Sequence, residues 1–298
     1  MVDRDALAIA FASHNAELND FHVKVYPSLD YERVEGPFSL ILVNFPAKLG
    51  LKGLEVFVCG ASEHLGVAGV LGIVVVRELT SVLERLLEDL GIRILYEEHK
   101  KGYSIFHVAF TENIPEPKRK YEREAMTVSL SKDYSVRTAT GLPEFDTLSF
   151  GTFALFSLLR GLEGYDSVLV LEPGQGHAAV AVMDSLKPEE LVLASRDLLC
   201  LGFAERNVRC NFGIEPETVH LPYLGDVPEQ DLVLWRILRK DDLAVDTHNL
   251  GVLLKRRVKP LIAYGETRLL RRLLRKQPVA VLKEASERNY SAQLIRPV

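Results

Sequence analysis

A strand, a turn and a helix in the middle of the chain contain the residues best suited to hold a ligand. Four apolar residues, 168–171, predict a buried parallel strand, and the acid Glu172 follows them directly. Gly174 and Gly176 come next, before a helix-compatible run over 178–183. Glycines let the backbone approach a ligand, and a helix N-terminus offers free N–H groups. The pattern predicts a nucleotide-type loop; a tight turn without a ligand is the alternative.

A second apolar strand, about 20 residues further on, ends in polar residues that bear on the same site. It ends at Ser195 and Arg196, followed by Asp197. Side chains at this position of a nucleotide-binding fold face the ribose of the ligand. We therefore predict that Glu172, Gly174, Gly176, Ser195 and Arg196 form a cofactor-binding group.

The overall composition is that of an ordinary globular protein and excludes several function classes. The chain has 298 residues, 47% of them hydrophobic and 26% charged, and a net charge of −5, which gives no global argument for nucleic acid. The longest apolar run, 65–76, is too short to span a bilayer, and no signal peptide is evident. The three cysteines lack metal-ligand spacing. These features predict a cytoplasmic protein without a membrane segment or a metal site.

The chain contains an internal repeat, because the segment 2–19 recurs at 194–211. At an offset of 192, seven of the 18 aligned positions are identical: Arg4/Arg196, Asp5/Asp197, Leu7/Leu199, Phe11/Phe203, Ala12/Ala204, Asn15/Asn207 and Asn19/Asn211. The same offset aligns the apolar runs 39–43 and 231–235. Agreement of offset, residue type and predicted element indicates a duplicated α/β unit.

Both copies alternate apolar strands with amphipathic helices, which predicts mostly parallel, doubly wound sheets with an antiparallel edge hairpin. In the first copy we predict strands at 22–26, 39–44, 70–76, 92–97 and 103–110, and helices at 4–19, 52–65 and 79–90. In the second we predict strands at 167–172, 191–195, 217–221, 231–236, 260–264, 279–283 and 290–295, and helices at 177–186, 197–211, 243–257 and 266–276.

The predicted domains are a truncated N-terminal domain over 1–114, a linker and lead-in segment over 115–145, and a C-terminal domain over 146–298. Prolines and charges mark the linker, and strand-like alternation within 121–150 predicts a cover for one face of the second domain. Residues 166–192 have no counterpart in the first copy, which therefore lacks its opening strand, loop and helix. We expect either residues upstream of Met1 or a first sheet rearranged around the gap.

Several motifs carry a resemblance to a known family. The loop reads Glu172-Pro173-Gly174-Gln175-Gly176-His177-Ala178, the end of the fourth strand of the first copy reads Asn44-Phe45-Pro46-Ala47, and 141–152 forms a lead-in segment. On these residues the chain resembles the two-domain ribosomal RNA guanine-N2 methyltransferases, whose two tandem units have the Rossmann-like class I methyltransferase fold. The resemblance implies S-adenosylmethionine as cofactor and ribosomal RNA or a ribosomal subunit as partner.

The same motifs depart from the family pattern in complementary ways. The family loop, Asp-x-Gly-x-Gly-x-Gly, loses its third glycine here, and its ribose-binding acid matches Asp3 in the first copy but Ser195 in the second. The family tetrapeptide, Asn-Pro-Pro-aromatic, keeps its Asn and second Pro at Asn44 and Pro46 and is lost entirely at 236–239. The first copy therefore retains part of the tetrapeptide but lacks the glycine loop, and the second copy retains the loop but lacks the tetrapeptide.

The tetrapeptide carries the chemistry of amine methylation. The resemblance implies that the Asn side chain and the next carbonyl accept the N–H hydrogens of an exocyclic amine, while an aromatic ring stacks on the base. Positioning of this kind provides most of the catalysis. Arg236 can donate but cannot accept hydrogen bonds, so it cannot replace the Asn. The predicted catalytic residues are Asn44, Phe45 and Pro46; a plain strand end followed by a turn is the alternative.

A basic region near the C-terminus is the candidate RNA-binding surface. Its residues are Lys255, Arg256, Arg257, Arg271 and Arg272. Such a cluster could bind RNA phosphates. The helical spacing of the arginines between 268 and 275 is equally typical of a solvated helix face.

Three functions are compatible with the sequence. The first is an S-adenosylmethionine-dependent methyltransferase that modifies an exocyclic base amine of ribosomal RNA. The second is a catalytically silent relative that binds RNA or a partner protein. The third is an NADP-dependent oxidoreductase, because 174–179 also fits Gly-x-Gly-x-x-Ala and Arg196 would suit a 2′-phosphate.

Overall fold

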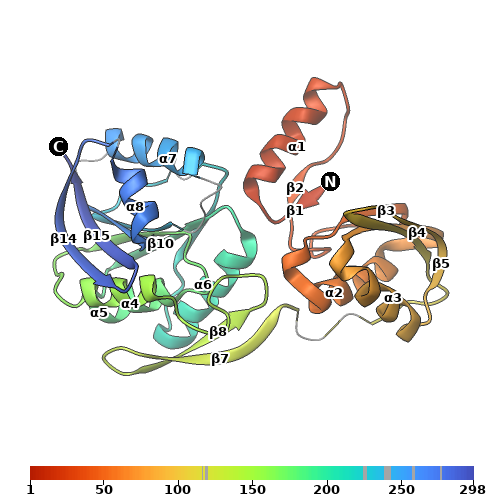
Figure 1. Cartoon of the computed structure of the whole chain (residues 1–298), viewed down its shortest axis with the longest axis horizontal. Helices are drawn as coiled ribbons and strands as arrows, with labels where there is room; N and C mark the ends of the chain where they lie inside the picture. The colour runs from red at the N-terminus through yellow and green to blue at the C-terminus, as the bar shows by residue number, and fades with distance from the viewer. Residues whose placement is uncertain (116, 118–119, 224–226, 238–242, 257–258, 276) are drawn as a thin grey trace. The chain divides into compact units, whose positions relative to one another are not determined.

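The chain forms two compact units. The computed structural model describes residues 1–115, 117, 120–223, 227–237, 243–256, 259–275 and 277–298 (Figure 1). Contacts group Asp3–Pro27 with Arg123–Val298 in one unit, hereafter the large unit, and Ser28–Glu122 in the other, the small unit. The predicted domain limits differ from these units, because residues 3–27 and the hairpin before residue 146 belong to the large unit.

The large unit contains a seven-stranded sheet in the order β11-β10-β9-β12-β13-β15-β14. Its strands are β9 (Ser167–Leu171), β10 (Glu190–Ser195), β11 (Glu217–His220), β12 (Leu232–Ile237), β13 (Leu261–Glu266), β14 (Val279–Glu287) and β15 (Tyr290–Pro297). The first five strands in this order are parallel, and β15 is antiparallel to both β13 and β14. The mostly parallel sheet with an antiparallel hairpin at one end is therefore confirmed.

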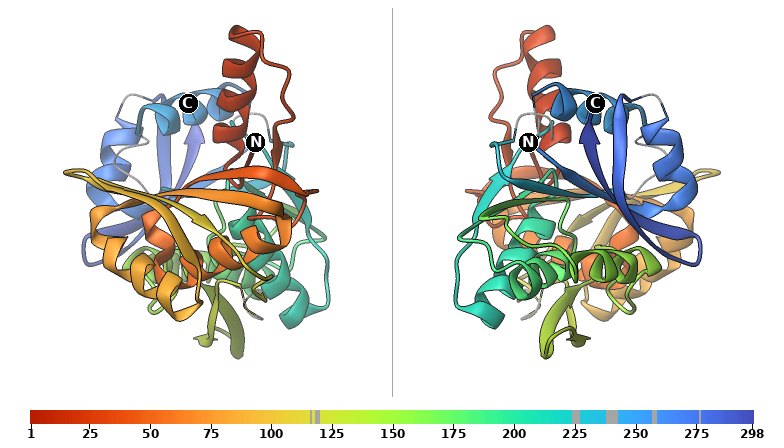
Figure 2. Two further views of the ribbon diagram at one scale, coloured as in Figure 1. Left: turned by 90° about the vertical axis from the view of Figure 1, so that its right-hand side faces the viewer. Right: turned by 90° about the vertical axis from the view of Figure 1, so that its left-hand side faces the viewer.

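Helices cover both faces of this sheet (Figure 2). They are α4 (Phe150–Leu159), α5 (His177–Ser185), α6 (Leu198–Phe212), α7 (Leu243–Arg256) and α8 (Thr267–Leu274). Val168 and Val170 of β9 pack with α4, α5 and α6, while Leu169 and Leu171 pack with α7 and α8. Alternate residues of a strand point to opposite faces, so a strand buried on both faces is apolar throughout.

A two-stranded hairpin and an N-terminal segment complete the large unit. The hairpin, β7 (Glu122–Ser129) and β8 (Asp133–Ala139), contributes Val128, Tyr134 and Val136 to the core on the α5 and α6 side. The hairpin thus covers one face of the large unit, as predicted. The N-terminal segment contains β1 (Val2–Asp3), α1 (Ala6–Leu18) and β2 (Tyr26–Pro27), and only Ala6 and Ala16 of α1 are buried.

The small unit repeats the last part of the same topology. Its four strands, in the order β3-β4-β6-β5, are β3 (Phe38–Asn44), β4 (Leu65–Val76), β5 (Arg93–His99) and β6 (Tyr103–Ala109). β3 and β4 are parallel, and β6 is antiparallel to both β4 and β5. This matches β12-β13-β15-β14 of the large unit strand for strand, which supports the predicted duplication.

The small sheet is covered on one face by α2 (Gly50–His64) and α3 (Thr80–Asp89), with short 3-10 turns at Ala47–Leu49 and Arg77–Leu79 (Figure 2). Leu71, Ile73 and Val75 of β4 are buried, whereas Leu40 and Leu42 of β3 are exposed. Among the described residues β3 pairs only with β4, so it is an edge strand. The sheet is not rearranged around the missing elements: it keeps its order and leaves that edge open.

Most predicted elements are present, with three notable differences. α4 was not predicted, because its sequence is apolar on all sides and shows no helical period. The strand predicted over 22–26 is reduced to the two residues of β2, and β4 begins at Leu65 rather than at Val70. A strand that begins directly at a helix end leaves no polar turn residues to mark the boundary.

Candidate functional site

The predicted loop lies between β9 and α5 and has the backbone of a ligand-binding turn. Gly174 has φ of +61° and Gly176 of +93°, and Gly176 is the N-cap of α5. Glu172 also has a positive φ, +52°, which is uncommon for a residue with a side chain. Such a conformation at a strand end is often found at functional sites, where the surrounding structure holds it.

The carboxylate of Glu172 is held by the two residues that the sequence placed beside it. Ser195 Oγ donates to one carboxylate oxygen at 2.8 Å, and the Arg196 backbone N–H donates to the other at 3.2 Å. Burial raises the pKa of Glu172 above its ordinary value, although both hydrogen bonds act in the opposite direction. The structure thus brings Glu172, Ser195 and Arg196 together at the carboxyl ends of β9 and β10.

Gly176 and the residue before it are fixed by packing rather than open to a ligand. A Cβ at position 176 would lie 2.8 Å from the Cα of Ala204 in α6. The Gln175 side chain is fully buried, accepts from Ala139 N–H at 2.9 Å and donates to the Ala139, Leu142 and Pro143 carbonyls. The variable residue of the Gly-x-Gly turn therefore anchors the lead-in segment to the large unit.

A buried ion pair occupies the space above Gly174. Arg236 Nη1 lies 2.9 Å from Glu144 Oε2, and a Cβ at position 174 would lie only 2.8 Å from the same Nη1. His177 Nδ1 is 3.5 Å from that carboxylate oxygen. Burial favours the neutral acid, but Arg236 and His177 outweigh it and hold the pKa of Glu144 well below its usual range.

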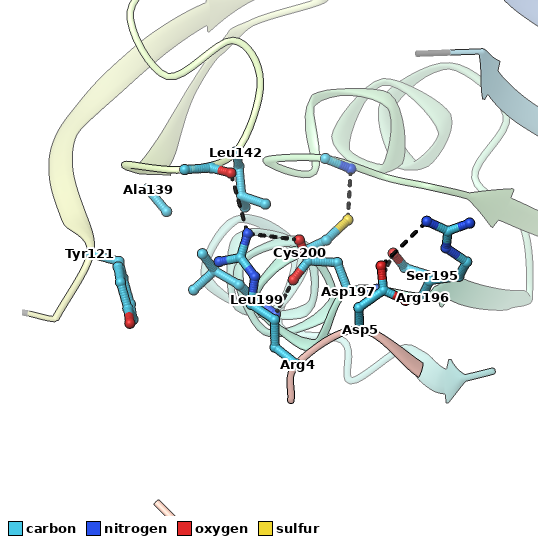
Figure 3. Close-up of polar contacts among 12 residues, drawn as sticks. Arg4, Asp5, Tyr121, Ala139, Leu142, Ser195, Arg196, Asp197, Leu199 and Cys200 are labelled. Carbon is cyan, nitrogen blue, oxygen red and sulfur yellow. Dashed lines mark hydrogen bonds and ion pairs between the residues drawn. The ribbon is translucent and has the colours of Figure 1, made fainter. Parts of the chain in front are cut away.

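Glu144 and Cys200 are site residues that the motif analysis did not identify. Glu144 accepts from Ser149 N–H at 2.7 Å and Thr152 Oγ1 at 2.6 Å through its second oxygen. Cys200 Sγ accepts from Gly174 N–H at 3.0 Å, and burial raises the pKa of its thiol (Figure 3). No spacing rule links these residues to the loop, because they come from distant segments of the chain.

The N-terminal segment meets the turn after β10 through its own repeat counterparts. Arg4 lies 3.1 Å from Asp197, and Arg196 lies 3.3 Å from Asp5 (Figure 3). The backbone bonds are equally reciprocal: Ala6 N–H donates to Arg196 O at 2.8 Å, and Leu198 N–H donates to Arg4 O at 3.1 Å. Equivalent residues of the two copies thus face each other across a local pseudo-twofold axis.

This contact bears on the predicted ribose position. Ser195 is fully buried, and its Oγ accepts from Asp197 N–H at 3.0 Å in addition to donating to Glu172. The Arg196 guanidinium is paired with Asp5, so it is not free for the 2′-phosphate that the oxidoreductase hypothesis requires. The antiparallel β15 between β13 and β14 also departs from the six-stranded order typical of dinucleotide-binding folds.

The tetrapeptide residues belong to the small unit, whereas the loop belongs to the large unit. Asn44 is the last residue of β3 and is exposed. Phe45 is only 4% exposed and packs edge to face on Phe57, with 5.6 Å between ring centroids. Pro46 is the N-cap of the following 3-10 turn. Asn44 is thus accessible, while the Phe45 ring is part of the core and is not available to stack on a base.

The structure separates the predicted RNA-binding residues. Lys255 is exposed on α7, whereas the Arg256 side chain and Arg257 lie outside the described residues. Arg271 and Arg272 are exposed on α8, whose leucines at 269, 270, 273 and 274 are buried. The arginines therefore follow the solvent-facing side of an amphipathic helix.

The small unit also carries a group of possible metal ligands. Glu84, Glu97 and His99 bring three possible metal ligands within 4.8 Å of one another, on the surface of the small unit. Glu97 and His99 are exposed, as is common for surface charges that hold no ion. No helix in the described part of the chain is long and apolar enough to cross a membrane.

Comparison with known proteins gives one family match and one curated relative, each for about a third of the chain. Residues 1–107 match the family model of the methyltransferase small domain. The uncharacterized protein YbxB of Bacillus subtilis (strain 168) is 33% identical over 110 residues, which are 35% of this chain and 54% of YbxB. The chain therefore spans about half the length of this curated relative.

The fold of the chain is similar to that of a solved methyltransferase. The 16S rRNA N2 G1207 methyltransferase (RsmC) of T. thermophilus, in complex with AdoMet and guanosine, superposes with a TM-score of 0.75 at 14% identity, covering 100% of this chain and 81% of RsmC. The predicted class I methyltransferase fold is thus confirmed. The family match supports the resemblance to methyltransferases for residues 1–107, and RsmC shows the same fold.

Proposed function

We propose that this chain, built on the RsmC-like methyltransferase fold, is an S-adenosylmethionine-dependent methyltransferase that acts on an exocyclic base amine of ribosomal RNA. The observation that carries the proposal is the loop between β9 and α5, with its acid and two left-handed glycines, in a fold shared with an AdoMet-bound enzyme. The match of residues 1–107 to the methyltransferase small domain adds independent support.

The loop backbone fits such a cofactor, but one side chain must leave before it can bind. Gly174 projects no Cβ toward the ligand, the missing Cβ of Gly176 lets the turn pack closely on α6, and the first turn of α5 offers N–H groups. Arg236 Nη1 lies where a ligand would contact Gly174. Because the guanidinium is the far end of a flexible chain, it can turn away. When bound, S-adenosylmethionine supplies an already activated methyl group.

The sequence predicts that Asn44, in the small unit, orients the amine. The Asn44 amide oxygen is an acceptor, and the side chain is exposed at a strand end. By accepting an N–H hydrogen it would direct the amine lone pair, a positioning effect. Phe45 takes no part in this role, because its ring is buried.

One observation favours a second candidate, the catalytically silent relative that binds RNA. The Arg236–Glu144 pair fills the space above Gly174, and Arg236, which stands at the tetrapeptide position of the large unit, cannot accept the hydrogens of an amine. A loop closed in this way would keep the fold without the cofactor.

Calorimetric titration with S-adenosylmethionine, its demethylated product and NADPH separates these functions. Binding of the first two supports the methyltransferase, binding of NADPH alone supports the oxidoreductase, and no binding favours the silent relative. The double variant Arg236→Ala/Glu144→Gln removes the guanidinium without leaving an unpaired buried carboxylate. We expect it to bind S-adenosylmethionine about tenfold more tightly, because the closed arrangement no longer competes.

Methyl transfer to ribosomal RNA is the second readout. Asn44→Ala should reduce the transfer rate by about 100-fold or more without changing cofactor affinity, since positioning groups act on the rate. Ser39→Ala, on the same strand, is the matched control. Equal transfer rates for Asn44→Ala and the control would exclude the tetrapeptide from the chemistry.

A further inference from the structure

The small unit brings an imidazole and two carboxylates together at the outer edge of its sheet. Glu97 and His99 are two residues apart in β5, so their side chains point to the same face. Glu84 belongs to α3, one of the two helices that cover this sheet. One possible ligand atom from each of the three residues lies within 4.8 Å of the other two. Donors from a helix and a strand therefore converge on one point.

The converging atoms have few other partners. His99 Nε2 lies 4.0 Å from Glu84 Oε1, which is the limit of an ion pair. Within the part of the chain that the structure describes, Glu97 makes no hydrogen bond or ion pair. Two carboxylates at this separation repel each other, and a neutral imidazole does not offset that repulsion. A divalent cation between them would.

The His99 ring is held from behind by a buried hydroxyl. Its Nδ1 is hydrogen-bonded to Ser104 Oγ at 3.0 Å, and that hydroxyl is 2.8 Å from Thr80 Oγ1. Ser104 is only 1% exposed, and the buried Phe106 ring packs edge to face on the imidazole, with 5.9 Å between centroids. The nitrogen that remains free, Nε2, is the one that faces the carboxylate. Metal-binding histidines are oriented in this way, by an oxygen on their other ring nitrogen.

The donor set favours zinc over the alkaline-earth cations. Imidazole is a good ligand for zinc, whereas magnesium and calcium are bound almost entirely by oxygen. Zinc bonds of about 2.0–2.2 Å in a tetrahedral site place the ligand atoms about 3.4 Å apart. The Glu84 and Glu97 side chains reach the surface, so rotation of their side-chain bonds can close the remaining distance. Three protein ligands leave a fourth position for water.

We propose that Glu84, Glu97 and His99 bind a zinc ion, through one oxygen of each carboxylate and Nε2 of the imidazole. The proposal goes beyond the methyltransferase assignment, because it needs neither the cofactor loop nor Asn44. It differs from the prediction that the chain has no metal site, which rested on the spacing of the cysteines. The ion would join α3 to β5 and so stabilise the small unit.

The experiment is a calorimetric titration of the full chain with zinc chloride, with magnesium chloride as the contrast. The test variants are His99→Gln, Glu97→Gln and Ser104→Ala. The matched control is His107→Gln, which removes an exposed imidazole from the neighbouring strand β6. A second control, Cys210→Ser, removes the exposed thiol, because thiolates also bind zinc. His99 and Glu97 are exposed, so both variants should fold, and circular dichroism checks this.

We expect His99→Gln and Glu97→Gln to lose zinc affinity by at least about 100-fold, because each removes a ligand. Ser104→Ala keeps every ligand but no longer holds the ring, and should lose about tenfold. Both controls should change by less than about threefold. Zinc should also raise the unfolding temperature of wild type and not that of His99→Gln.

Absence of zinc binding to wild type would overturn the proposal, as would equal losses in His99→Gln and His107→Gln. Zinc binding that disappears in Cys210→Ser, or magnesium binding as tight as zinc binding, would overturn it as well. S-adenosylmethionine affinity is measured in the same variants and should not change, so failure of this site and failure of the proposed function are distinguishable.

Discussion

The Arg236–Glu144 pair determines, at the scale of single residues, whether the glycine loop is open. Both side chains are buried, and Glu144 is also the acceptor for Ser149 and Thr152. Removing one partner of such a pair leaves the other charge buried without compensation, which costs more than the pair contributes when intact. The pair therefore couples stability of the large unit to access of a ligand to Gly174.

Glu144→Gln should lower the free energy of unfolding by about 3 kcal/mol at pH 7. Because the folded pKa of Glu144 lies below the ordinary value of 4.5, its contribution is complete above that value. It is lost as pH falls through the lowered folded pKa. The difference between wild type and variant should therefore shrink in acid, as measured by urea unfolding at a series of pH values.

Glu172→Gln is the control, because its stability difference from wild type should change with pH in the opposite direction. Burial raises the pKa of Glu172, so its charged form is unfavourable in the folded chain above that raised pKa, and wild type gains stability relative to the variant as pH falls. Parallel pH profiles for the two variants would contradict both assignments.

The sequence predicted the loop residues but not their neighbours. Glu172, Ser195 and Arg196 follow strand ends at a spacing typical of nucleotide-binding folds, so their proximity could be inferred. Glu144 and Arg236 are 92 residues apart by their numbers, and only the folded chain shows that they meet above Gly174. A sequence motif predicts the backbone of a ligand-binding loop, but it does not predict which side chains occupy the space above that loop.

At the scale of elements, α6 holds the hairpin through two asparagines one turn apart. Asn207 Oδ1 accepts from Arg137 N–H at 2.9 Å, and its Nδ2 donates to the carbonyls of Arg137 and Gln175 at 2.8 and 2.7 Å. Asn211 makes the corresponding pair of bonds with Ser135 at 3.2 and 2.8 Å. Alternate residues of β8 are thus hydrogen-bonded by a helix as if by a neighbouring strand.

Asn207→Ala should destabilise the large unit by about 3 kcal/mol, because it leaves several buried backbone groups without partners. Asn211→Ala removes bonds of the same kind at a partly exposed position, where water can replace them, and should cost about 1 kcal/mol. Thermal or urea unfolding of both variants measures the difference. Equal losses would show that burial of the Asn207 bonds has no energetic consequence.

The helical period predicted the elements that have a single apolar face, and it failed for α4, which is apolar on nearly every side. The helix pattern of α8, with buried leucines and exposed arginines, is clear in the sequence. α4 is apolar on nearly every side because it packs on the sheet and beside α5, so a period of 3.6 residues is absent. Long-range packing, not local propensity, makes that segment a helix.

At the scale of the whole molecule, the duplication explains which parts associate. The repeat placed residues 2–19 in the first domain, yet residues 3–27 pack with the large unit. Reciprocal contacts between Arg4-Asp5-Ala6 and Arg196-Asp197-Leu198 account for this. Two identical turns that each carry an Arg and an Asp are self-complementary, as equivalent surfaces are in a symmetric dimer.

The two caps of this contact have the same chemistry in different surroundings. Asp5 accepts from Leu7 N–H at 2.8 Å and caps α1, and Asp197 accepts from Leu199 N–H at 3.1 Å and caps α6. α6 carries Leu199, Phe203 and Val208 into the core, whereas α1 buries only Ala6 and Ala16. Loss of an N-cap lowers the stability of a whole unit only if the capped helix is part of the core of that unit.

Asp197→Ala should therefore lower the stability of the large unit by about 2 kcal/mol, and Asp5→Ala by about 0.5 kcal/mol, although each removes one N-cap and one ion pair. Urea unfolding followed by Trp235, which is buried in the large unit, reports this difference. Helix content from circular dichroism should fall in Asp5→Ala before the Trp235 signal changes, because α1 can fray alone. If both variants unfold at the same urea concentration, the N-terminal segment is as integral to the large unit as α6, and the exposed surface of α1 does not reflect its energetic role.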